Sequence, residues 1–133
     1  MPEVTTVTQA ETNAFMQRYW AGDRSALAVD AVFTDVASGE RHEGRDAVVA
    51  MLDAFYGEAF DVTPEEVRHI IGEGSAALEA TLVGRHVGDC YGVAATGKSV
   101  RLPLCVTYRV SDAGISEGRV YFLSEVFLRQ VAS

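Results

Sequence analysis

Two helices are predicted near the start of the chain, where apolar residues recur every three to four positions. The first covers residues 8–21, and Thr8 and Glu11 stand at the spacing of a capping box at its start. Gly22 ends this helix. A short second helix is expected over residues 23–29, with the aspartate at its first position as the cap.

A strand and a third helix follow. The apolar run at residues 31–36 predicts a short strand. Residues 45–59 carry an amphipathic stripe and predict the third helix, and Pro64 is expected in the loop behind it. The stripe consists of Val48, Met51, Leu52, Phe55 and Tyr56.

The second half of the chain changes to an alternation of apolar and polar residues. This pattern predicts strands at 67–73, 78–83, 100–110 and 115–130, with a glycine-rich segment at 84–97. Helices first and strands second indicate an α+β fold. The sheet is expected to be antiparallel or mixed.

The longest predicted strands reach ~11–15 residues, more than the usual five or six, and need curvature to remain compact. A curved sheet around the three N-terminal helices would leave a cone-shaped cavity with an apolar lining. Candidate bend positions are Gly84, Gly88, Gly92 and Gly118. Expected contributors to the cavity are Phe15, Trp20, Phe55, Leu104, Val106 and Phe122.

Composition narrows the classes of partner. The chain has 133 residues, the length of one domain over residues 1–133, and a net charge of −8. Without a cluster of basic residues, nucleic acid and anionic membrane surfaces are not expected as partners. Cys90 and Cys105 are interpreted as reduced packing residues. The N-terminal residues lack the features of a signal peptide, and no window approaches the ~18 apolar residues of a membrane span, so a cytoplasmic location is predicted.

Asp35 is the main candidate for chemistry, because it closes a hydrophobic run and is followed by a polar loop. Inside a pocket this carboxylate could act as a general base toward a carbon acid or water. The alternative is a strand-end aspartate that accepts hydrogen bonds from the amides of its own loop.

Four stretches carry a resemblance to a known family: FMQRYWAGDRSAL, AVFTDVASGERHEGRDAV, GRHVGDCYGVAATGKSVRLP and RVSDAGISEGRVYFLSEVFLRQ. In this order the chain resembles the nuclear transport factor 2-like superfamily, within it the SnoaL-like and ketosteroid-isomerase-like branch. The resemblance implies the conical fold and a homodimer through the outer face of the sheet. It does not imply one chemistry, because relatives include isomerases, cyclases, epoxide hydrolases and binding modules.

Only some of the catalytic residues of these relatives have a counterpart in this chain. The general base of ketosteroid isomerases falls on Asp35, but their two oxyanion donors fall on Phe15 and Val106, which cannot donate. The acid of SnoaL-type cyclases falls near Val120. The Asp-Arg-Asp set of limonene epoxide hydrolases lacks its acids.

Other polar groups could complete a site. His86 has the strand parity to point inward and is a second catalytic candidate; the alternative is a core or rim histidine bonded to a backbone group. Tyr19 and Tyr108 could hold a substrate oxygen, or could pack with their hydroxyls at the rim. His42, in the loop, could contact a substrate at the mouth of the pocket or could be solvated. No metal-binding spacing occurs, and acid–base chemistry implies no cofactor.

The sequence thus predicts a protein that binds a small apolar molecule, polyketide-, steroid- or terpene-like, with Asp35 as the base of an isomerase, cyclase or hydrolase. The alternative is a non-catalytic ligand-binding or dimerisation module of the same fold. The predicted substrate-binding residues are Phe15, Tyr19, Trp20, Phe55, Val106, Tyr108, Val120 and Phe122.

Overall fold

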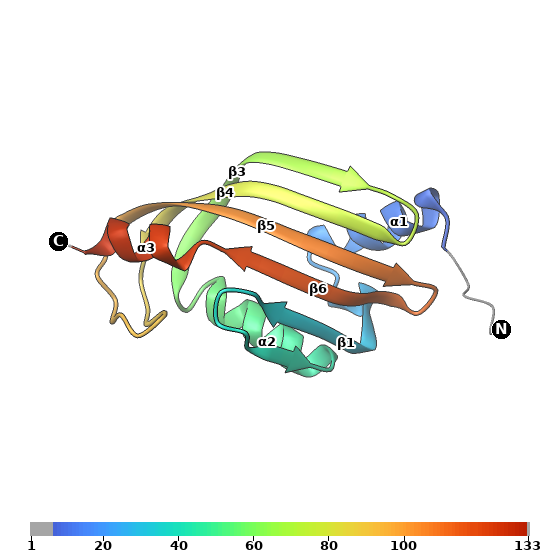
Figure 1. Ribbon diagram of the computed structural model, residues 1–133, viewed down its shortest axis with the longest axis horizontal. Helices are drawn as coiled ribbons and strands as arrows, with labels where there is room; N and C mark the ends of the chain where they lie inside the picture. Colours follow the sequence, from blue (N-terminus) through green and yellow to red (C-terminus); the bar gives the residue numbers. More distant parts are fainter. Residues whose placement is uncertain (1–6, 133) are drawn as a thin grey trace.

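The computed structural model describes residues 7–132, which form three α-helices, a short 3₁₀ helix and one six-stranded sheet (Figure 1). The strand order in the sheet is β2-β1-β6-β5-β4-β3. β1 and β6 are parallel, and every other neighbouring pair is antiparallel, so the sheet is mixed. The elements are α1 (Gln9–Trp20), η1 (Arg24–Ala26), β1 (Leu27–Asp35), β2 (Arg41–Glu43), α2 (Arg45–Phe55), β3 (Phe60–Ile71), β4 (Ser75–His86), β5 (Ser99–Ser111), β6 (Gly114–Phe122) and α3 (Ser124–Val131).

The start of the chain confirms the predicted capping box. The Thr8 hydroxyl accepts from the Glu11 amide at 3.1 Å, and the Glu11 carboxylate accepts from the Thr8 amide at 3.0 Å. The second helix is shorter than predicted, because β1 already begins at Leu27. Residues of this strand pair with both β2 and β6, and this pairing outweighs the local helical pattern.

The prediction for the end of the chain is wrong. The last strand ends at Phe122, and residues 124–131 form helix α3 instead of continuing the sheet. Phe127 and Val131 lie four residues apart on α3, and both are buried against the core. This helical spacing explains why the alternation of polar and apolar residues weakens after Phe122.

The long strand predicted at residues 100–110 is confirmed as β5, which has 13 residues. β3 and β4 have 12 residues each and are longer than the strands predicted at residues 67–73 and 78–83. Pro64, expected in a loop, lies within β3, an edge strand, where one side needs no amide donor. Helix α1 contacts β3 to β6, and α2 contacts β1 and β2. The buried face of β5 has the predicted set: Val100, Leu102, Leu104, Val106, Tyr108 and Val110.

Gly118 of β6 is needed for a close approach rather than for a bend. A Cβ atom at this position would lie 2.6 Å from Cζ of Phe33, whose ring crosses β6 there. Phe33 can therefore lie flat against the sheet and pack near Tyr108, with ring centroids 6.1 Å apart. Within residues 7–132, no helix is long and apolar enough to cross a membrane.

Candidate active site

A cavity of about 620 Å³ lies between the inner face of the sheet, the ends of α1 and α2, and the segment that follows β4. Its volume is in the range of pockets that hold drug-sized molecules. Most of its wall is apolar. The apolar lining includes Met51, Leu52 and Phe55 of α2, and Val62, Leu78, Leu82, Leu104, Val106 and Phe122 of the sheet.

The register of the sheet places Asp35 in this wall. Asp35 is the last residue of β1 and lies beside Val120 of β6, which in turn pairs with Val106 of β5. Side chains at paired positions of neighbouring strands point to the same face. Asp35 therefore shares one row across the sheet with apolar side chains that also line the cavity.

The Asp35 carboxylate is half-buried and accepts hydrogen bonds from its own loop. Oδ1 accepts from the Ala37 amide at 3.1 Å, and Oδ2 accepts from the Ser38 hydroxyl at 3.0 Å. These are the contacts that the turn interpretation predicts. Because Asp35 also lines the cavity, the turn holds the carboxylate in place without removing it from the site.

Tyr91 supplies the third contact to Asp35. Its hydroxyl donates to Oδ2 at 2.5 Å, and its ring stacks on Phe122 with centroids 5.3 Å apart and planes 23° apart. Burial, followed by the hydrogen bond to Asp35, raises the pKa of the Tyr91 phenol well above its usual value. The phenol is therefore protonated at neutral pH and acts as a donor.

The sequence did not predict a role for Tyr91. It lies in the aperiodic segment between β4 and β5, 56 residues from Asp35 along the chain. The only local sign of a turn in the sequence is Gly92, which follows it. In the structure Tyr91 and Gly92 both have positive φ angles, 48° and 77°.

Two tyrosines lie in the wall next to Phe33. The rings of Tyr19, from α1, and Tyr108, from β5, meet edge to face with centroids 5.8 Å apart. Burial is the main cause of a raised pKa in both phenols. Both hydroxyls therefore carry their proton at neutral pH and can donate to a ligand oxygen.

Most of the predicted binding residues line the cavity, but Phe15 does not. Its ring packs at the margin of the core, with the Arg18 guanidinium carbon 5.7 Å from the ring centre. Phe15 lies one helical turn before Tyr19, and Tyr19 and Trp20 are the residues of α1 that reach the cavity. The predicted residues that line the wall are Tyr19, Trp20, Phe55, Val106, Tyr108, Val120 and Phe122.

His86 also lies outside the cavity wall, in the core position that was the alternative to a catalytic role. The ring is fully buried, 4.9 Å from Phe127 and 5.6 Å from Phe60 between centroids. Its Nδ1 lies 2.9 Å from the Thr96 hydroxyl and accepts from the Thr96 amide at 3.3 Å. The side chain does point to the buried face of the sheet, as its place in the strand alternation predicted. There Phe127 of α3 packs against the ring, and the contacts with Thr96 hold one end of the segment between β4 and β5.

Further polar groups complete the rim on the side of Asp35. His42 of β2 lies beside Phe33 in the register, and its Nε2 is 3.8 Å from the Glu40 carboxylate. Asp89 and Cys90 line the wall from the segment after β4. Burial, followed by the charge of Asp35, raises the pKa of the Cys90 thiol to about 11, which makes it a poor nucleophile at neutral pH.

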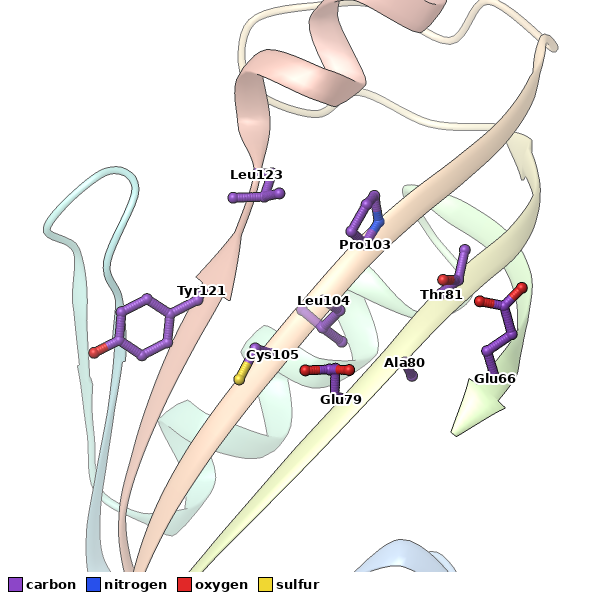
Figure 2. A pocket seen from close by; sticks show the side chains of 9 residues that line it. All are labelled: Glu66, Glu79, Ala80, Thr81, Pro103, Leu104, Cys105, Tyr121 and Leu123. Carbon is purple, nitrogen blue, oxygen red and sulfur yellow. The ribbon is translucent and has the colours of Figure 1, made fainter. Parts of the chain in front are cut away.

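A second hollow of about 300 Å³ lies on the outer face of the sheet (Figure 2). There Cys105 of β5 lies between Glu79 of β4 and Tyr121 of β6, and Leu123 follows at the end of β6. Tyr121 and Leu123 are 38% and 49% exposed. This hollow has about half the volume of the inner cavity and no contact with Asp35, so we place the candidate site inside.

Comparison with known proteins then identifies the family. The family model of the SnoaL-like polyketide cyclases matches residues 5–130, nearly the whole chain. The chain belongs to this family. None of the curated proteins matches the sequence.

Solved structures share the SnoaL-like fold at low identity. A proposed polyketide cyclase from Pseudomonas putida is 22% identical, with a TM-score of 0.77 over 95% of this chain and 99% of that chain. A proposed polyketide cyclase from Xanthomonas campestris is 22% identical, with a TM-score of 0.73 over 93% of both chains. A proposed hydroxylase from Streptomyces galilaeus is also 22% identical, with a TM-score of 0.70 over 93% of this chain and 82% of that chain. These structures agree with this chain in fold and differ in the chemistry their names suggest, so the activity must be argued from the cavity.

Proposed function

We propose that this protein binds a small, largely apolar ketone and catalyses an acid–base isomerisation or cyclisation with Asp35 as the base. The observation that supports this most directly is the Asp35 carboxylate in the wall of a cavity that is otherwise mainly apolar. A polyketide-, steroid- or terpene-like skeleton suits this lining, because an apolar surface is buried favourably only against other apolar groups.

The chemistry is a proton transfer. Asp35 takes a proton from the carbon next to the ligand's carbonyl group, and the electron pair of that C–H bond passes to the carbonyl oxygen as an enolate. The hydroxyls of Tyr19 and Tyr108 stabilise this oxygen by hydrogen bonds. Isomerisation returns the proton to another carbon. In cyclisation the enolate carbon attacks a second carbonyl, and the proton goes to the new alkoxide.

Ligand binding in the inner cavity can be tested before the reaction is known. A thermal-shift screen with polycyclic and terpenoid ketones should yield compounds that raise the Tm by several degrees at 100 times their Kd, since such binding stabilises by about 2.7 kcal/mol. Val106→Trp fills the cavity from β5 and should abolish the shift. Val29→Trp, at a position that is 74% exposed, is the matched control and should retain it. An equal shift in the protein with Val106→Trp would place the ligand elsewhere.

The alternative function is a non-catalytic binding module of the same fold. Three hydrogen bonds to Asp35 are compatible with a purely structural carboxylate. The apolar Val106 and Val120, at positions where relatives are expected to carry catalytic groups, also favour it. A module of this kind would bind the same ketones without accelerating any proton transfer.

We also propose that two copies pair through the outer face of the sheet. Tyr121 and Leu123 are exposed there, and Glu79 and Arg119 provide charges of both signs on the same face, as a self-complementary two-fold interface requires. Light scattering should give twice the 14.3 kDa mass of one chain. Tyr121→Arg should shift the protein to one copy, while Val29→Arg should not. A single-chain mass for the unaltered protein at micromolar concentration would exclude this dimer.

A further inference from the structure

The side chain of Tyr91 occupies the part of the cavity beside Asp35 as a ligand would. Its ring lies on Phe122 at 5.3 Å, and its hydroxyl donates to Oδ2 of Asp35. We propose that this subsite binds a hydroxyl-bearing aromatic or enolic ring of the ligand, and that this ring displaces Tyr91, which otherwise closes the site. The inference rests on the proposed function, because it concerns the same cavity.

The turn that carries Tyr91 is suited to such an exchange. Cys90 and Val93 bond to each other through their backbones at 3.0 and 2.9 Å, with Tyr91 and Gly92 at the tip. Both tip residues have positive φ angles, 48° and 77°, as in a type I′ turn. A tyrosine in this left-handed region is strained, and its contacts with Asp35 and Phe122 compensate. When a ligand takes over those contacts, the side chain of Tyr91 no longer offsets the strain.

The two ends of the segment are held, so only its middle is expected to move. The Gly88 amide donates to the Ala59 carbonyl at 3.0 Å, and Thr96 is bound to the His86 ring. Between these anchors, within the described part of the chain, the Tyr91 hydroxyl makes the one hydrogen bond to residues outside the segment. Breaking that bond therefore opens the site without unfolding the segment.

The chemistry of the subsite selects the ligand group. Oδ2 of Asp35 accepts from the hydroxyls of Ser38 and Tyr91, so a group that replaces Tyr91 must also be a donor, such as a phenol or an enol. An O-methylated ring can stack on Phe122 but cannot donate. A carboxylate is disfavoured, because Asp35, Glu40 and Asp89 all line this end of the cavity.

Two probes of nearly equal shape test the exchange, 2-naphthol and 2-methoxynaphthalene. Tyr91→Phe removes the competing hydroxyl and keeps the ring, so 2-naphthol should bind about tenfold more tightly than to the unaltered protein, the range of one charge-assisted hydrogen bond. Binding of 2-methoxynaphthalene should tighten by a similar factor, because it displaces the same side chain from Phe122. In both proteins 2-naphthol should bind more tightly than 2-methoxynaphthalene, because only 2-naphthol can donate to Asp35. Asp35→Asn should remove the preference for 2-naphthol. Tyr121→Phe, on the outer face, is the matched control and should leave both affinities unchanged.

Tyr91→Gly serves as a second variant, since glycine suits the φ of 48° at that position and leaves the subsite open. It should bind both probes more tightly than the unaltered protein does. The exchange would be overturned if each probe bound the unaltered protein, Tyr91→Phe and Tyr91→Gly with the same affinity. If Val106→Trp still abolished binding in that case, the proposed function would remain. Failure of both probes to bind any of these proteins would overturn the proposed subsite, and a negative ketone screen beside it would overturn the proposed function as well.

Discussion

Asp35→Asn should lower kcat by about 10²–10⁴-fold on a ketone identified by the binding screen, with a much smaller change in Kd. The amide has almost the same shape as the carboxylate but cannot take a proton. Its oxygen can still accept from the Ala37 amide or the Ser38 hydroxyl, so the turn should be retained. The rate is measured under saturating ligand, and folding is checked by circular dichroism and Tm.

The matched control is Asp112→Asn, in the exposed turn between β5 and β6. It makes the same chemical change far from the cavity and should leave kcat unaltered. If Asp35→Asn has the rate of the unaltered protein, the carboxylate does not transfer the proton, and the binding-module alternative is favoured.

Tyr108→Phe should lower kcat by about 10²–10³-fold, the typical cost of losing one donor to a developing oxyanion. The change removes only a hydroxyl from a buried side chain in the cavity wall. The raised pKa of this phenol keeps its proton in place at neutral pH, so the lost interaction is a hydrogen bond and not a charge. The effect should fall on kcat more than on KM, because the oxygen carries its full charge only in the transition state.

Tyr19→Phe is the informative comparison, since the two rings meet at 5.8 Å and both face the cavity. A large loss for one variant alone would identify the donor. Tyr121→Phe controls for the loss of a tyrosine hydroxyl on the outer face. If kcat remains unchanged in both Tyr19→Phe and Tyr108→Phe, these hydroxyls do not stabilise the enolate.

Sequence patterns predicted the parts of the fold that depend on residues close together along the chain. The capping box at Thr8, the stripe on α2 and the alternation along β5 are set by helix and strand periods, and the structure has all three. The short helix α3 was missed, because its eight residues follow directly on a strand and show only two buried positions. The parallel pairing of β1 with β6 depends on contacts between segments more than 80 residues apart, for which one sequence contains no direct sign.

The same distinction applies to the site. Asp35 could be found because it stands at the end of a hydrophobic strand, and Tyr19 and Tyr108 because they lie on periodic elements. Tyr91 lies in a segment without a period, and only the folded chain brings its hydroxyl to Asp35. Strand parity made His86 a candidate for the cavity or for the core, and it could not reveal that Phe127 of α3 would contact the ring.

The most direct test of the proposal is proton exchange on a bound ketone. 2-Tetralone is a neutral bicyclic ketone with acidic C–H groups beside its carbonyl, and its exchange in D₂O can be followed by proton NMR without knowledge of the natural substrate. The unaltered protein should accelerate this exchange, Asp112→Asn should do so equally, and Asp35→Asn should fall back to the rate in buffer. Equal acceleration by the protein with Asp35→Asn, or none by the unaltered protein while 2-tetralone is bound in the cavity, would contradict the role assigned to Asp35.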